Sequence, residues 1–139
     1  MFKKDYIMQL IQTLMDAIMR ISTNIDTGDF EKANEDLNKS YEWLGGSSDF
    51  FKSSNVDEIV SFLNSEDANY SKKTEMLGHL FFMEANMAMG NKDKWELLIK
   101  ANFFFEYYIE ESKEFSFEVN GKITQIMTQL NEINYRYEE

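Results

Sequence analysis

Apolar residues recur along much of the chain at alternating spacings of four and three residues, which is the spacing of one face of an α-helix. In the first segment this stripe consists of Ile7, Ile11, Leu14, Ile18, Ile21 and Ile25. Gly28 suits a left-handed cap at the end of this helix, and Asp29 suits the N-cap of a second helix from Phe30 to about Leu44. Because only a glycine-centred turn separates the two helices, we expect an antiparallel hairpin.

Three methionines lie beside this stripe and widen the apolar face of the first helix: Met8, Met15 and Met19. A face of that width predicts that two neighbouring helices pack against it, whereas a simple surface helix needs only one. Methionine in such positions most often fills gaps in a core.

The middle of the chain, residues 45–69, connects this hairpin to a second one. It begins with GGSSDFFKSSN, which has the composition of a linker, and Phe50 and Phe51 within it predict a loop that is fixed to the body of the protein. Asn55 is followed three residues later by Glu58. This arrangement resembles a capping box and predicts a short helix.

A second pair of helices is expected over residues 70–112, with Gly90 at the turn between them. The helix after the turn, from about Asp93 to Ser112, is the most aromatic part of the chain, and its apolar side chains cover nearly every direction around the axis. Such a helix is usually buried in the middle of a bundle or shared with a partner. A last helix, over about residues 117–139, carries another stripe with four-three spacing: Val119, Ile123, Ile126, Leu130, Ile133 and Tyr137.

Together these segments predict an all-α fold of five to six helices in a single domain, residues 1–139. The helical pairs cover about residues 4–44 and 70–112, residues 45–69 connect them, and the C-terminal helix covers about residues 117–139. The composition agrees, because the chain contains no proline, which favours long uninterrupted helices. Its 43% hydrophobic residues are enough for a core in a chain of this length.

The charge of the chain excludes several partners. Its 139 residues include 14 basic and 25 acidic side chains, which gives a net charge of −11. This charge opposes binding to a nucleic-acid backbone or to an anionic membrane surface. No apolar stretch is long enough to span a bilayer. We therefore predict a cytoplasmic protein with no nucleic-acid or membrane partner.

The residues needed for most catalytic and metal chemistry are missing. The chain contains no cysteine and a single histidine, His79, and it lacks the serine hydrolase, P-loop and Rossmann motifs. Glu75 and Glu84 lie near His79, but di-metal sites of helical bundles need a second histidine and a different spacing. We expect His79 to bridge core and solvent, and we expect no catalytic residue, no metal site and no cofactor.

A stripe of carboxylates follows one face of the aromatic helix: Glu106, Glu110 and Glu114. Such a stripe could bind a divalent cation or a basic partner. Charged runs on helices are, however, typical of a face in contact with solvent, and we interpret this stripe in that way.

Two short strings resemble parts of the tetratricopeptide repeat. GDFEKA, from Gly28 to Ala33, resembles the start of the second helix of the repeat, and Leu77, Gly78 and Phe81 resemble positions of its first helix. The opening MFKKDYIM, with the long helix and turn after it, also resembles a family of small uncharacterised bacterial proteins with tetratricopeptide-like helices. The resemblance implies a right-handed array or bundle of helical hairpins that acts as an interaction scaffold, without assigning a partner.

The aromatic helix has more large side chains than one core can accept from one helix, so some must meet a second packing surface, a partner or solvent. Phe104, Tyr107 and Tyr108 are the candidates for contact with a partner or ligand. We predict a non-enzymatic protein-interaction or scaffolding module that binds an unknown protein or peptide in a groove between helix pairs. Two alternatives stay open, namely a bundle that binds a small apolar ligand between aromatic and methionine-rich helices, and an aromatic homodimer interface.

Overall fold

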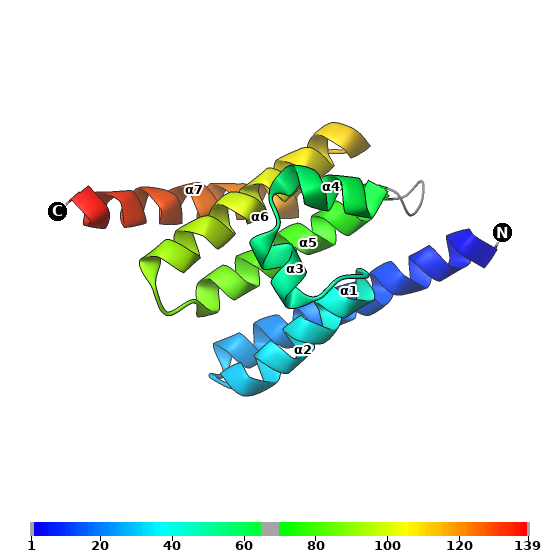
Figure 1. Cartoon of the computed structure of the whole chain (residues 1–139), viewed down its shortest axis with the longest axis horizontal. Helices are drawn as coiled ribbons and strands as arrows, with labels where there is room; N and C mark the ends of the chain where they lie inside the picture. The colour runs from blue at the N-terminus through cyan, green and yellow to red at the C-terminus, as the bar shows by residue number, and fades with distance from the viewer. Residues whose placement is uncertain (1, 65–69, 139) are drawn as a thin grey trace.

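The computed structural model describes residues 2–64 and 70–138, with the side chains of residues 6–64 and 71–133. Within these ranges every regular element is an α-helix, which confirms the all-α prediction (Figure 1). The helices are α1 (Phe2–Asp26), α2 (Phe30–Trp43), α3 (Ser48–Ser53), α4 (Val56–Asn64), α5 (Tyr70–Met87), α6 (Asn91–Ser112) and α7 (Phe117–Glu138). These described ranges hold seven helices where five to six were predicted, because the linker-like segment contains the short helix α3.

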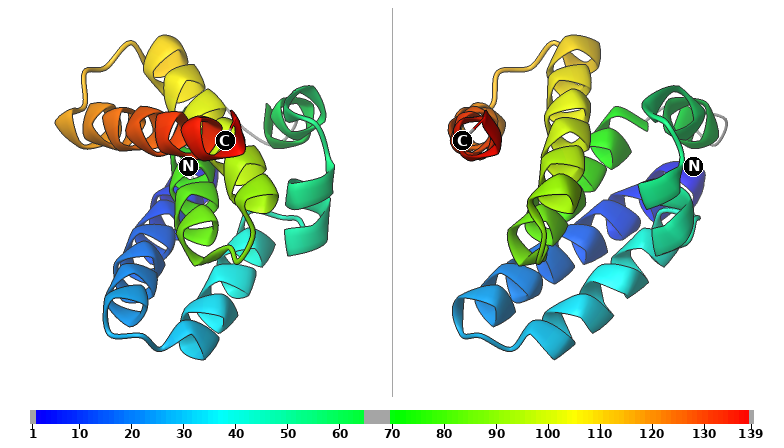
Figure 2. Two further views of the ribbon diagram at one scale, coloured as in Figure 1. Left: turned by 90° about the vertical axis from the view of Figure 1, so that its left-hand side faces the viewer. Right: turned by 60° about the vertical axis from the view of Figure 1, so that its left-hand side comes forward.

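The first hairpin has the turn that its sequence predicts. Gly28 adopts the left-handed conformation, with φ of +84°, which L side chains rarely occupy. The Asp29 carboxylate then accepts a 3.2 Å hydrogen bond from the backbone N–H of Lys32 and caps α2. α1 and α2 consequently run side by side in opposite directions (Figure 2).

The outer face of α1 is exposed, so the three methionines beside its stripe do not enter the core. Leu14 and Ile21 on the stripe are fully buried, whereas Met8, Met15 and Met19 are 62%, 46% and 69% exposed. The two neighbours that the apolar face predicts are present, because α1 packs against α2 and α5. These two helices cover the isoleucine stripe and leave the methionine side open.

The linker-like segment is fixed to the body, as predicted, but it folds into a helix and not into a loop. Ser47 caps α3 by accepting a 3.0 Å hydrogen bond from the backbone N–H of Phe50. Phe51 is fully buried and stacks on Tyr41 of α2, with ring centroids 5.5 Å apart. A helix this short is marginal alone, so burial of the phenylalanine ring against α2 holds it in place.

Asn55 and Glu58 form the predicted capping box at the start of α4. The backbone N–H of Glu58 donates to the Asn55 side chain at 2.9 Å, and the backbone N–H of Asn55 donates to the Glu58 carboxylate at 3.3 Å. The pair satisfies two backbone donors that the helix itself leaves free, and it starts α4 directly after α3.

α5 packs against four other helices, α1, α2, α4 and α6 (Figures 1 and 2). Its residues 73–83 are all buried. Gly78 allows the close approach of α6, because a Cβ atom there would lie 2.8 Å from the Phe105 ring. The aromatic pattern predicts that the helix over residues 93–112 is central or shared with a partner, and its carboxylate stripe predicts one solvated face. α6 has that exposed face, which includes Glu106, and α5 is the helix that most others contact. The central position of α5 could not be predicted from its apolar pattern, because several of its buried residues are polar.

α7 lies across α6 (Figure 2). Val119, Ile126, Leu130 and Ile133 of its predicted stripe are buried, while Tyr137 lies outside the described side chains. Among residues 2–64 and 70–138, no helix has the length and apolar character needed to cross a membrane.

Candidate functional site

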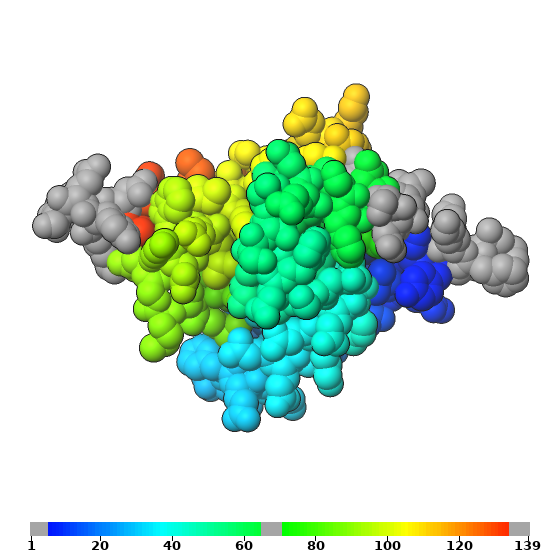
Figure 3. Space-filling view, viewed as in Figure 1, coloured from blue at the N-terminus to red at the C-terminus, as the bar shows by residue number. Residues whose placement is uncertain are grey.

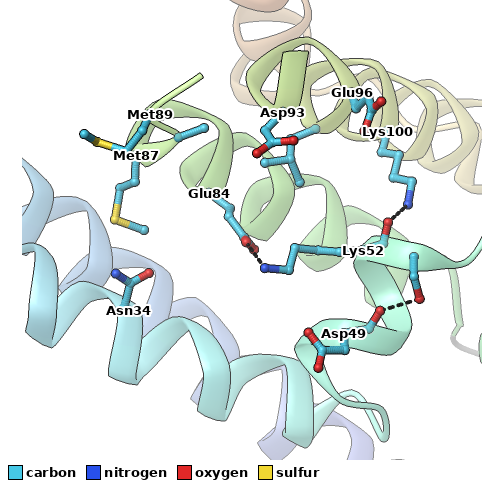
Figure 4. Close-up of a pocket in the computed structure, with 12 residues that line it drawn as sticks. Asn34, Asp49, Lys52, Glu84, Met87, Met89, Asp93, Glu96 and Lys100 are labelled. Atoms are coloured by element: carbon cyan, nitrogen blue, oxygen red, sulfur yellow. Dashed lines mark hydrogen bonds and ion pairs between the residues drawn. The ribbon is translucent and has the colours of Figure 1, made fainter. Parts of the chain in front are cut away.

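An open cleft of 640 Å³ lies between the two hairpins. α2 and α3 border it on one side, and the end of α5 and the first turns of α6 border it on the other (Figure 4). On the face shown in Figure 3, it lies where the cyan α2, the blue-green α3 and the yellow-green start of α6 meet. Its volume falls within the range of ligand sites, about 300–1,000 Å³. Its apolar wall consists of Met87, Ala88, Met89 and Leu97, and its charged residues are Asp49, Lys52, Glu84, Asp93, Glu96 and Lys100.

Glu84 ties three helices together at the floor of the cleft. Its Oε1 accepts a 2.7 Å hydrogen bond from the buried hydroxyl of Tyr41 on α2, and its Oε2 lies 2.8 Å from Lys52 Nζ on α3. Burial, followed by the negative charge of Glu84 and the hydrogen bond to it, raises the pKa of Tyr41 well above its ordinary value. Tyr41 therefore stays protonated at neutral pH and acts as a fixed donor.

Lys100 fastens α6 to the end of α3. Its ammonium group donates to the backbone carbonyl oxygens of Phe51, Lys52 and Ser54 at 3.1, 2.5 and 2.8 Å. These carbonyls lie at the C-terminal end of α3, where a helix leaves acceptors unsatisfied and a cation is favourable. Burial lowers the pKa of Lys100, and the nearby charge of Glu96 opposes this only in part.

The remaining charge of the cleft is negative. The side chains of Asp49, Asp93 and Glu96 are exposed, and none of them forms an ion pair with another residue of the described ranges. Asp93 lies in the first turn of α6, where the helix N-terminus offsets part of its charge. Asp49 on α3 has no such compensation, and Glu96 on α6 is offset only by the nearby charge of Lys100. The cleft holds four carboxylates and two lysines, so a cationic group entering it would be stabilised.

The three aromatic residues predicted to contact a partner lie outside the cleft. Phe104 is fully buried, with its ring centroid 6.0 Å from that of Phe81 in the core. Tyr108 is 3% exposed, and its hydroxyl accepts a 3.3 Å hydrogen bond from Lys72 Nζ. Tyr107 is half-buried and stacks on Phe103. The structure thus uses two of the three inside the core and does not bring them together on one surface. Their contact with a partner or ligand stays a prediction.

His79 is buried at the junction of α5, α6 and α7. Its Nε2 lies 3.6 Å from Glu75 and 3.4 Å from the exposed Glu118, and its ring packs edge-on against Phe105. Burial raises the pKa of Glu75, but the hydrogen bond from His79 and the charge of Lys72 outweigh this, so the pKa is lowered overall. A bridge between core and solvent was expected for His79; its side chain lies in the core and reaches the surface only through its contact with the exposed Glu118.

The other sequence candidates remain separate from the cleft. Glu106 and Glu110 are exposed on α6, as expected for a solvated face, and Glu114 follows the end of this helix. The described part of the chain contains no group of three or more histidine and carboxylate side chains that could hold a metal ion.

The cleft residues were not singled out as a site in the sequence. Tyr41, Lys52, Glu84 and Lys100 come from four different helices, and no local motif contains more than one of them. One signal was available, because Glu84 interrupts the apolar run LFFMEANM on a helix that is otherwise suited to a core. A charge in such a run usually has a buried partner. Comparison of the chain with protein-family models, with curated proteins and with solved structures found no match.

Proposed function

We propose that this protein is a non-enzymatic interaction module that binds a segment of another protein in the cleft between its two hairpins. The main support for this proposal is the cleft itself, which has an open volume of 640 Å³, an apolar wall that contains methionine, and a charged rim. Interfaces commonly combine an apolar centre with polar groups at the edge. A site of this size suits a short chain segment and is too small for a folded domain.

The packing of the hairpins supports the tetratricopeptide-like interpretation. α5 packs on both helices of the first hairpin, so the second hairpin stacks on the first and does not close a separate bundle. Repeat proteins of this kind bind partners along surfaces that stacked hairpins create. A cleft between the hairpins is therefore the place where such a fold would bind.

The contacts of the cleft favour binding over catalysis. Tyr41, Lys52 and Glu84 hold one another, and Lys100 holds the end of α3. Residues engaged in this way give the cleft a fixed shape, which lowers the entropic cost of binding a partner.

A small apolar ligand is the second candidate function. The volume of the cleft is large enough for one, and four of its lining residues are apolar. Its open form and charged rim favour a peptide, because buried ligand sites usually enclose most of the ligand.

Site-specific photo-crosslinking in the cells that make the protein tests the proposal. A photoreactive amino acid replaces either Met89, which is fully exposed at the cleft, or Met127, which is exposed on α7. We expect a discrete product, heavier than the chain, from position 89 and not from position 127. Adding Ala88→Trp, which fills the cleft, should remove it. Identical products at the two positions, or products that survive the filled cleft, would contradict the proposal.

A further inference from the structure

We infer that the cleft accepts a basic segment of the partner, in which Lys or Arg side chains stand next to apolar ones. This inference rests on the proposed function and specifies the chemistry of the partner. Three features of the cleft support it, namely its excess of carboxylates over lysines, the contacts that already hold its two lysines, and its methionine wall.

Negative charge reaches the cleft from three elements. Asp49 on α3 and Glu96 on α6 lie on different sides of it, and neither is paired with another described residue (Figure 4). Between them α5 ends, and its last turn contains no basic side chain that would offset the partial negative charge of a helix C-terminus. A Lys or Arg side chain in the cleft would therefore meet two carboxylates and a helix end.

The two lysines of the cleft already bind acceptors within the protein, which argues against an acidic partner. Lys52 is held by Glu84 at 2.8 Å, and Lys100 donates to three backbone carbonyls at the end of α3. An acidic segment would have to draw one of these lysines away and leave its acceptors without a donor. The net charge of −11 would also slow the approach of an acidic partner, whereas it would speed that of a basic one.

The apolar wall requires that the partner presents more than charge. Met89 is fully exposed, and Met87 and Leu97 lie beside it in the lining. Methionine is unbranched and flexible, so it adapts to apolar side chains of different shape. A bare cation or a polyamine would leave this wall in contact with water, but a segment that mixes basic and apolar residues would cover it.

Titration of the full chain with three probes, followed by amide NMR, tests the inference. The probes are a short amidated peptide of alternating Lys and Leu, the matching peptide of Glu and Leu, and spermidine. The Lys–Leu peptide should bind most tightly, shift the amides of residues 48–53 and 87–97, and bind more weakly as salt is added.

Two double variants, each of which removes two negative charges, test whether the carboxylates of the cleft bind the peptide. Asp49→Asn with Glu96→Gln should weaken binding of the Lys–Leu peptide about three- to thirtyfold, as expected for two surface ion pairs. Glu106→Gln with Glu110→Gln removes the same charge from the exposed face of α6 and should change affinity by less than about twofold.

Several results would overturn the inference. Tighter binding of the Glu–Leu peptide would show that the cleft prefers an acidic partner. Binding of spermidine with the same affinity as the Lys–Leu peptide would identify a small cation as the ligand. Equal weakening by both double variants, or amide shifts outside the cleft, would show unspecific attraction. If Met89 crosslinks a partner while the Lys–Leu peptide fails, the proposed function stands and only the partner chemistry is wrong. If the Met89 crosslink fails, the proposed function itself is wrong.

Discussion

α5 carries two glutamates with similarly low exposure, and they stand in different surroundings. Glu75 has 12% and Glu84 has 15% of its side chain exposed, and each contacts a lysine. At Glu75 the neighbouring side chain is the buried His79, whose ring packs against Phe105. At Glu84 the chain turns from α5 into α6, and the cleft opens beside the carboxylate.

A carboxylate with low exposure does not by itself mark a binding site. Both glutamates have partners for their charge, but Glu75 contacts Lys72 and His79 of its own helix. Glu84 joins α5 to Tyr41 of α2 and Lys52 of α3. What differs is the packing around them, because the middle of α5 is covered on all sides whereas its end is not. Changes near Glu75 should therefore affect stability alone, and changes near Glu84 should affect both stability and the shape of the cleft.

The largest expected effect is that of Phe51→Ala, on the cleft side. The variant leaves a cavity under α3 and should lower the free energy of unfolding by about 3–5 kcal/mol, measured in urea. Hydrogen exchange of residues 48–53 should rise at the same time. The matched variant Phe115→Ala removes an exposed ring and should change stability by less than about 0.5 kcal/mol. A loss below about 1 kcal/mol for Phe51→Ala would show that its ring does not hold α3.

Gly78→Ala should have the next largest effect, on the side of Glu75. The added methyl group would lie 2.8 Å from the Phe105 ring, so the buried ring or the two helices must shift, at a cost of about 1–3 kcal/mol. Gly121→Ala is the control, because no atom lies within 4 Å of its Cβ position. That change should stabilise α7 by about 0.5–1 kcal/mol. Equal effects of the two substitutions in urea unfolding would contradict the close packing at Gly78.

Lys100→Met should have a smaller effect, again on the cleft side. It keeps the apolar stem but removes the donor for three carbonyl groups, which should cost about 1–2 kcal/mol. The exposed Lys92 lies on the same helix, and Lys92→Met should change stability by less than about 0.5 kcal/mol. Amide NMR should show shifts at the end of α3 in the first variant only; shifts there in both, or in neither, would argue against the role of Lys100.

The smallest effect concerns Glu75 and pH. Because its pKa in the folded protein lies below the ordinary value of 4.5, its charged form stabilises the fold above that pH. This contribution is lost as the pH falls through the lowered pKa. Wild type should therefore exceed Glu75→Gln in stability at neutral pH, and the difference should shrink on acidification below pH 4.5. Glu106→Gln, which changes an exposed glutamate, serves as the control in the same urea unfolding measurements. A stability difference between wild type and Glu75→Gln that does not change with pH would contradict the role of the Glu75 charge.

The local features of the fold could be predicted from sequence because they depend on neighbouring residues. The turn at Gly28, the N-cap at Asp29 and the capping box of Asn55 and Glu58 all occur as predicted. α3 was missed because its stability comes from burial of Phe51 against α2, a contact between distant segments.

Which helix is covered, and where a site forms, could not be predicted in the same way. The apolar pattern shows that a face can be buried, but it does not show which helix buries it. For this reason Met8 was expected beside a buried stripe and is exposed, and Phe104 was proposed as a contact residue and is fully buried. The cleft forms where separate helices meet, and its charged residues come from α3, α5 and α6, so no single stretch of the sequence contains the set.

Hydrogen exchange of the full chain, alone and with the partner captured through Met89, tests whether the partner occupies the cleft. The account predicts slower exchange at residues 48–53 and 87–97, which border the cleft, and unchanged exchange around Glu75 and His79. Protection that appears around Glu75, or on the exposed methionine side of α1, with no change at the cleft would contradict it.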